Sequence, residues 1–222
     1  MPAPCNVVVL ISGSGSNLQA LIDSIQADAD ASTRSPARIS AVVCNRADAF
    51  GLQRAQAAGI ATVVLDHKQF EGREAFDAAL VEAIDSYDPQ LVVLAGFMRI
   101  LGANFINLWR NRILNIHPSL LPSFKGLHTH ERAIESGVLF TGCTVHFVNP
   151  ELDDGPIIAQ AVIAINADDT PDSLAAKVLK KEHIIYPQAL KLVTEGRIRV
   201  VGNKVTMKNV IYAKECMINP IT

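Results

Sequence analysis

Short, almost continuously apolar runs alternate with longer segments of mixed polarity in the first half of this sequence, and this alternation limits the fold more than any other feature. Asn6–Ile11 (NVVVLI) is the clearest apolar run, and Ser16–Ala27 is the mixed segment that follows it. Strands that are apolar on both faces are typical of parallel sheets covered by helices on each side. The pattern therefore predicts an α/β fold with an open, mainly parallel sheet and helices on both faces, as in Rossmann-like proteins.

The same two patterns extend the prediction along the chain to residue 115. Gly59 is expected to end one helix and Pro89 to lie just beyond the next, because neither residue continues a helix well. The predicted strands are Asn6–Ile11, Ile39–Cys44, Ile60–Leu65, Gln90–Ala95 and a run that ends at Asn115. The predicted helices are Ser16–Ala27, Ala47–Ala58, Arg73–Tyr87 and Ala103–Arg110.

The pattern changes in the C-terminal half. Thr141–Asn149 alternates in polarity and Pro156–Ile165 follows closely, so we expect an antiparallel extension of the sheet. Thr170–Val193 is predicted to be a long amphipathic helix. Two short β-prone runs then flank Gly202-Asn203, which predicts a terminal hairpin of Arg197–Val201 and Lys204–Met207. No repeat or linker divides the chain, so we expect a single domain.

Composition excludes several classes of protein. Hydrophobic residues make up 49% of the 222 residues, enough for a substantial core. The net charge is −2 and no basic run occurs, which argues against nucleic-acid binding. The four cysteines form no CxxC pair, so neither a zinc site nor a disulfide framework is indicated. The first apolar run is too short to span a membrane and follows no basic segment, so we expect a cytoplasmic protein that binds no membrane.

A glycine loop, Ser12-Gly13-Ser14-Gly15-Ser16-Asn17, joins the first predicted strand to the first helix. Backbone N–H groups at a helix start favour an anion. A Walker A loop would need a Gly-Lys-Ser/Thr step, and a dinucleotide fingerprint would need a third glycine where Leu18 stands. A phosphate monoester fits better than NAD or ATP. An ordinary glycine turn with a Ser or Asn helix cap fits this loop as well.

Asn115 and His117 stand at a strand end, one residue apart, before a stretch broken by two prolines and a glycine. On a strand both side chains point to the same face, and at a carboxyl end that face borders the crevice where ligands bind. An amide and a protonated imidazole could together bind an oxyanion. The loop NPELDDGP offers Glu151, Asp153 and Asp154 as carboxylate partners. A structural histidine and a solvated acidic turn are the alternative interpretation.

The other histidines suggest no second centre. His128, His130 and Glu131 resemble a metal cluster only superficially, because no further ligands accompany them at a recognised spacing, and we predict no metal. His146 lies on a predicted strand and could face the same cleft. His67 and His183 have no evident partners in the sequence.

Four motifs in this order carry a resemblance: LISGSGSNLQALID, VVLAGFMRIL, NIHPSLLP with GLHTH, and HFVNPELDDGPII. Together they are similar to the glycinamide ribonucleotide formyltransferases, within the formyltransferase family, from about Asn6 to the KEHIIYP segment. The resemblance implies transfer of a formyl group from 10-formyltetrahydrofolate, a co-substrate, to the amine of N1-(5-phospho-D-ribosyl)glycinamide in purine biosynthesis. It also implies small-molecule substrates, and we expect a monomer or homodimer.

The resemblance assigns roles to residues. It places the catalytic trio on Asn115, His117 and Asp153, where the position after Leu152 favours Asp153 over Asp154. It places Glu182 near the amine substrate. It places substrate phosphate binding on Gly13, Ser14, Gly15, Ser16 and Asn17, and folate binding on Arg73, Met98, Arg99, Ile100, Leu101 and Asn115, with the loop 149–153. We accordingly divide the single domain 1–222 into a phosphate-binding half (1–110), a catalytic and folate half (111–195) and a terminal hairpin and tail (196–222).

The implied chemistry needs no Ser or Cys nucleophile, because the substrate amine itself attacks. Asp153 is expected to orient His117, favour its protonated form and assist proton movement. Related activities stay open as alternatives. A formyltetrahydrofolate deformylase would use water as acceptor and would be expected to carry a domain before the first strand. A methionyl-tRNA formyltransferase would be expected to carry an RNA-binding domain after the last helix. A non-catalytic nucleotide-binding module would need only the glycine loop.

Overall fold

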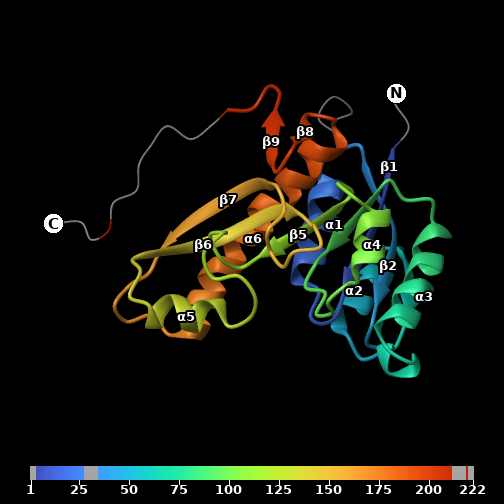
Figure 1. The fold of residues 1–222 in the computed structure, drawn as a ribbon, viewed down its shortest axis with the longest axis horizontal. Coiled ribbons are helices and arrows are strands. Elements are labelled where there is room, and N and C mark those ends of the chain that lie inside the picture. The colour runs from blue at the N-terminus through green and yellow to red at the C-terminus, as the bar shows by residue number, and fades with distance from the viewer. Residues whose placement is uncertain (1–3, 28–34, 212–218, 220–222) are drawn as a thin grey trace.

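A seven-stranded sheet forms the centre of the protein, shown in Figure 1. The computed structural model describes residues 4–27, 35–211 and 219. The strand order is β3-β2-β1-β4-β5-β6-β7; the first five of these are parallel, whereas β6 is antiparallel to both of its neighbours. The bounds are β1 Cys5–Ile11, β2 Ala37–Cys44, β3 Ala61–Val64, β4 Leu91–Leu94, β5 Ile113–His117, β6 Phe140–Phe147 and β7 Ile157–Ala164. The predicted fold class, with its antiparallel extension, is confirmed.

Helices cover both faces of the sheet because alternate strand residues point to opposite sides. Val7, Val9 and Ile11 of β1 belong to a core that includes residues of α1, α2 and α6. Val8 and Leu10 face the other way and pack with residues of α3 and α4. The helices are α1 Ser16–Ala27, α2 Phe50–Ala57, α3 Arg73–Asp85, α4 Ala103–Leu108, α5 Thr129–Glu135 and α6 Pro171–Thr194.

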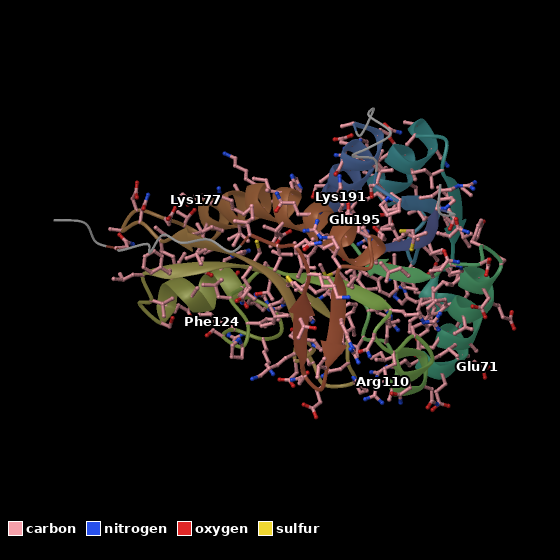
Figure 2. The ribbon with its side chains drawn as sticks, turned by 90° about the horizontal axis from the view of Figure 1, so that it is seen from above. Glu71, Arg110, Phe124, Lys177, Lys191 and Glu195 are labelled. Carbon is pink, nitrogen blue, oxygen red and sulfur yellow. The ribbon has the colours of Figure 1, made fainter. Side chains whose placement is uncertain are left out.

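The long helix α6 lies along the sheet, from near Lys177 to Glu195 in Figure 2. Thr170 caps its first turn: the Thr170 side chain accepts the Ser173 N–H and the Ser173 side chain accepts the Thr170 N–H. After α6 comes the predicted hairpin, β8 (Ile198–Val201) and β9 (Lys204–Met207). Residues 212–218 and 220–222 of the predicted tail lie outside the described residues. No helix within the described ranges is long and apolar enough to cross a membrane.

Besides shifts of one to three residues at element ends, three local features differ from the predictions. The strand expected to end at Asn115 continues to His117, so both polar residues are held by the sheet. A three-residue 3₁₀ helix, η1 (His67–Gln69), and the seven-residue α5 were not predicted, because elements this short leave no periodic pattern. Asp66 starts η1 by accepting the Lys68 N–H at 3.0 Å.

Candidate active site

The carboxyl ends of β1, β4 and β5 lie side by side, and the predicted site residues follow from them. Leu10 of β1 pairs with Leu94 of β4, and Leu94 pairs with Asn115 of β5. Because neighbouring strands are about 5 Å apart, the ends of β1 and β5 are separated by only about 10 Å. The glycine loop, the turn after β4 and Asn115 therefore share one edge of the sheet.

The glycine loop packs closely against the start of α2. Gly15 has φ +70°, and a Cβ added there would lie 2.6 Å from the Gly51 Cα. The Gly51 N–H donates to Gly13 O at 3.0 Å, and the Arg54 Nε–H donates to Ser14 O at 2.9 Å. The loop borders a pocket of about 470 Å³, whose lining residues are Ser12 to Asn17, Asn45, Arg46, His67, Ala95, Gly96, Met98 and Arg99. The loop thus brings the predicted phosphate-binding residues to an open pocket at the start of α1.

Asn17 connects this loop to α6. Its Nδ2–H donates to Glu182 Oε2 at 2.7 Å, and both side chains are buried. Burial raises the pKa of Glu182, and the hydrogen bond from Asn17 opposes that shift. The predicted contact of Glu182 with the amine substrate stays a prediction, because the structure joins this carboxyl to the glycine loop.

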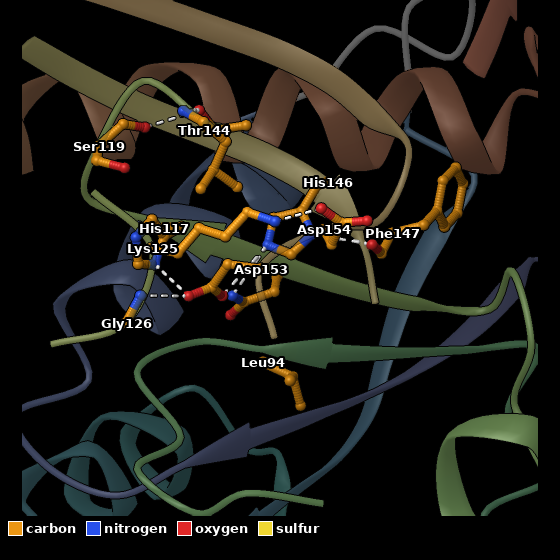
Figure 3. Close-up of polar contacts among 12 residues, drawn as sticks. Leu94, His117, Ser119, Lys125, Gly126, Thr144, His146, Phe147, Asp153 and Asp154 are labelled. Atoms are coloured by element: carbon orange, nitrogen blue, oxygen red, sulfur yellow. Dashed lines mark hydrogen bonds and ion pairs between the residues drawn. The ribbon is translucent and has the colours of Figure 1, made fainter. Parts of the chain in front are cut away.

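His117 and Asp153 meet although they lie far apart in the sequence. His117 Nδ1 lies 3.4 Å from Asp153 Oδ2, and Figure 3 shows the two side chains facing each other. The two side chains are only 7% and 10% exposed. The His117 Nε2–H donates to Phe124 O at 3.0 Å. The Gly126 N–H donates to Asp153 Oδ2 at 2.8 Å. Asp153 therefore holds both the imidazole and the loop that follows β5.

His146 on β6 positions the amide of Asn115. His146 Nδ1 lies 2.8 Å from Phe147 O, a carbonyl that can only accept, so Nδ1 carries the proton. Nε2 is then free to accept the Asn115 Nδ2–H across 3.2 Å. Burial lowers the pKa of His146, which favours this neutral form, while Phe147 O and Asp153 act in the opposite direction. One Nδ2–H of Asn115 remains for a ligand, and His146 does lie beside the predicted catalytic residues.

The two neighbouring aspartates have different partners. Asp154 forms an ion pair with Lys125 of the loop after β5, and that pairing lowers the pKa of Asp154. Asp153 adopts a left-handed backbone with φ +49° and faces His117 instead. The geometry therefore favours Asp153 over Asp154 as the carboxylate that acts with His117.

The turn predicted to bind folate is mostly open. Met98 and Ile100 are 72% and 65% exposed, whereas the Leu101 side chain is buried in the core, which leaves only its main chain for a ligand. Arg99 lines the pocket beside the glycine loop, and Arg73 is not among the lining residues.

Asp77 of α3 supports this turn. Its Oδ2 accepts the Gly102 N–H at 2.7 Å. Burial raises the pKa of Asp77, and the charges of Arg73 and Arg99 counteract the rise. The positive charges of Arg73 and Arg99 therefore both favour the ionised form of the Asp77 carboxyl, although the two arginines lie on different elements.

Sequence reasoning missed polar residues of the pocket. Asn45 follows β2 and His67 follows β3, and His67 Nδ1 lies 3.3 Å from Asn45 Nδ2. Both occupy carboxyl ends of parallel strands, the position that drew attention to Asn115, and the same rule would have identified them. Within the described residues, no group of three or more His, Cys, Asp or Glu side chains could hold a metal ion. Cys5, Cys44 and Cys143 are free thiols; Cys216 lies outside the described residues.

Residues 5–190 match the model of the formyl transferase family. The chain belongs to the formyl transferase family. Phosphoribosylglycinamide formyltransferase of Escherichia coli is 50% identical over 198 residues, 89% of this chain and 91% of that protein. The trifunctional purine biosynthetic protein adenosine-3 of Homo sapiens is 47% identical over 197 residues, which span only 19% of that protein.

Solved structures of the formyl transferase family share the fold. Glycinamide ribonucleotide transformylase 1 from Symbiobacterium toebii superposes with a TM-score of 0.88 at 44% identity, covering 93% of this chain and 95% of that chain. Phosphoribosylglycinamide formyltransferase from Coxiella burnetii gives a TM-score of 0.85 at 48% identity, covering 92% and 93%. The family membership expected from the four motifs is confirmed.

Proposed function

We propose that this chain is a phosphoribosylglycinamide formyltransferase, which moves the formyl group of 10-formyltetrahydrofolate to the amine of N1-(5-phospho-D-ribosyl)glycinamide. One observation supports the proposal above all: His117, Asp153 and Asn115 converge at the sheet edge that also carries the glycine-loop pocket. A site for one phosphate beside an oxyanion-binding pair suits a phosphorylated acceptor that attacks a formyl carbon. Such an enzyme acts on small molecules of purine biosynthesis in the cytoplasm.

The reaction exchanges one C–N bond for another. The substrate amine attacks the formyl carbon, negative charge develops on the formyl oxygen, and the bond to the folate nitrogen then breaks. The proton lost by the amine goes to that departing nitrogen. Asp153 lies 3.4 Å from His117 and is placed to pass this proton, directly or through water.

His117 and Asn115 stabilise the developing charge. The free Nδ2–H of Asn115 and the Nε2–H of His117 are the donors, and one such donor contributes about 3–4 kcal/mol to transition-state stabilisation. In the unliganded structure the His117 Nε2–H is donated to Phe124 O. In catalysis the His117 Nε2–H must therefore leave Phe124 O and donate to the formyl oxygen instead, while Asp153 stays beside His117 Nδ1.

The two substrates bind at different parts of the sheet edge formed by the carboxyl ends of the strands. The phosphate binds the N–H groups of Gly13 to Asn17, with Glu182 holding the Asn17 side chain. The exposed side chains of Met98 and Ile100 provide an apolar wall for a flat pteridine ring, and Arg99 and the Leu101 main chain border it. The charge of Arg73 lowers the pKa of Asp77, and the Asp77 carboxyl accepts the Gly102 N–H directly after this turn.

An absorbance assay of formyl loss from 10-formyltetrahydrofolate, with and without the ribonucleotide, tests the proposal. We expect turnover only when the ribonucleotide is present, with formylated ribonucleotide as the product. Equal turnover in its absence would indicate a deformylase and would overturn the proposal. Calorimetry with the ribonucleotide alone tests for a non-catalytic binding module: such a protein would bind the ribonucleotide but show no turnover in the absorbance assay. Light scattering on the same preparation decides between monomer and homodimer.

A further inference from the structure

A chain of hydrogen bonds crosses the carboxyl ends of four consecutive strands. Ser12 follows β1, and its Oγ accepts the Met98 N–H at 2.8 Å from the turn after β4. The same Oγ lies 2.6 Å from Oδ1 of Asn45, which follows β2. Asn45 Nδ2 lies 3.3 Å from Nδ1 of His67, which follows β3. The chain therefore connects the turn after β4 to the far side of the pocket.

Chemistry fixes the direction of the Met98–Ser12 and Ser12–Asn45 bonds. The Met98 N–H can only donate, so Ser12 Oγ accepts it and has one proton to give. A separation of 2.6 Å is typical of O–H···O, which identifies the Asn45 atom as the carbonyl oxygen. Asn45 Nδ2 lies 3.3 Å from His67 Nδ1, and the same Nδ1 lies 3.3 Å from the Asn45 carbonyl oxygen, so the tautomer of His67 decides whether Nδ1 accepts from the amide or donates to the carbonyl. Ser12 and Asn45 thus orient each other, and Ser12 orients the Met98 N–H.

Ser12 and Asn45 are the buried members of the chain, 5% and 3% exposed. Breaking a buried hydrogen bond on one side leaves its partner without water or protein to replace it, which costs about 1–3 kcal/mol. The Ser12 N–H also donates to Gly96 O at 3.1 Å, so side chain and main chain both link the glycine loop to the 96–98 segment. Two hydrogen bonds therefore join Ser12 to the 96–98 segment, and the Ser12 side of both bonds is shielded from water, although the Met98 side chain is exposed.

We propose that Ser12 and Asn45 are positioning residues that set the distance between the two substrate sites. Ser12 begins the loop assigned to the phosphate, and it holds the main chain of the turn assigned to the formyl donor. Asn45 fixes the Ser12 hydroxyl in the direction that keeps the Met98 N–H bound. This inference rests on the proposed function, because it concerns the alignment of donor and acceptor in that reaction.

The kinetic test uses Ser12→Ala, with Asn45→Ala as a second variant. Ser12→Ala removes the acceptor for the Met98 N–H but leaves the loop N–H groups in place. We expect the KM for the formyl donor to rise about tenfold and the KM for the ribonucleotide to stay within about twofold. Asn45→Ala should shift the donor KM in the same direction by a smaller factor. Ser40→Ala is the matched control, since the Ser40 hydroxyl donates to Val7 O, which lies before the carboxyl ends of the strands.

Hydrogen exchange of the Met98 amide provides a readout independent of activity. In the unliganded wild-type protein this amide should be protected, and in Ser12→Ala it should exchange at least about tenfold faster. A loss of stability alone would accelerate exchange throughout the core, so amides of β1 serve as the internal reference. Unchanged Met98 exchange in a folded Ser12→Ala variant would overturn the inference. So would an unchanged donor KM, whereas a wild-type protein without formyl transfer would instead contradict the proposed function.

Discussion

The two parts of the sheet edge are built in different ways. Where β2, β1 and β4 end, hydroxyl, amide and main-chain groups bond to one another across adjacent strands, as Ser12 and Asn45 do at 2.6 Å. Where β5 and β6 meet the 149–154 loop, a histidine faces a carboxylate, and Phe124 and Asp153 adopt left-handed backbones. In the proposed function the first part binds the phosphate, and the second, where His117 and Asp153 face each other, carries the chemistry. The difference suggests that binding and chemistry can be changed separately by mutation.

Replacement of Asn115 should lower activity as strongly as replacement of His117, and more than the substitutions in the next three paragraphs. Asn115→Ala removes an oxyanion donor and the donor to His146 Nε2, so kcat should fall about 10²- to 10³-fold. Asn115→Asp keeps the shape but has no N–H to donate, and should be similarly impaired. Steady-state kinetics on protein with a wild-type melting temperature provides the measurement. Wild-type kcat in either variant would remove Asn115 from the mechanism.

Replacing Asp153 and Asp154 one at a time tests which of the two carboxylates takes part in the reaction. Asp153→Asn can still accept the Gly126 N–H but no longer presents a negative charge to His117, so kcat should fall about a hundredfold. Asp154→Asn is the matched control: it weakens a partly exposed ion pair with Lys125 and leaves the contact between His117 and Asp153 in place, so kcat should stay within about threefold. A pH–rate profile of Asp153→Asn identical to that of the wild type would count against the coupling.

Glycine substitutions test the binding part. Gly15→Ala forces a side chain onto a left-handed backbone and against Gly51, and should cost about 2–4 kcal/mol of unfolding free energy. Gly13→Ala meets no heavy atom within 4 Å and should cost less than about 1 kcal/mol. Urea denaturation measures both. Equal losses in the two variants would show that the close approach of the loop to α2 does not matter.

Replacement of Glu182 should have the smallest effect, a change in the free energy of unfolding with pH. The direction of that change follows from the burial of the Glu182 carboxyl. Because burial raises its pKa above the ordinary 4.5, Glu182 favours folding when protonated, and that contribution is lost as the pH rises through the raised value. Glu182→Gln cannot ionise and can still accept from Asn17. The variant should therefore gain unfolding free energy relative to the wild type between acidic and neutral pH. A stability difference that is constant across this range would contradict the assignment.

Much of the fold could be predicted because each strand is a short apolar run and each long helix has a clear start and end. Ser16–Ala27 was predicted to the residue, since a glycine loop precedes it. The short η1 and α5 were missed because neither has a repeat, and α5 begins after His128 in a left-handed conformation, which is uncommon for any residue other than glycine.

The candidate site was less predictable, because its contacts join distant segments. The position of Asp153 beside His117 depended on resemblance to a family, and the pairing of Asn45 with His67 escaped notice because it spans two strand ends. The sequence also could not distinguish the exposed Met98 and Ile100 from the buried Leu101. Their orientation is set by how the turn packs on α3 and α4, which is a tertiary property.

Single-turnover formyl transfer by His117→Ala, with both substrates saturating, tests the central claim most directly. If the β5–β6 part carries the chemistry and the β1–β4 part carries the binding, the rate should fall about 10²- to 10³-fold. The dissociation constant of the ribonucleotide, measured by calorimetry, should stay within about threefold of the wild-type value. A wild-type rate in the folded variant, or a loss confined to ribonucleotide binding, would contradict the account.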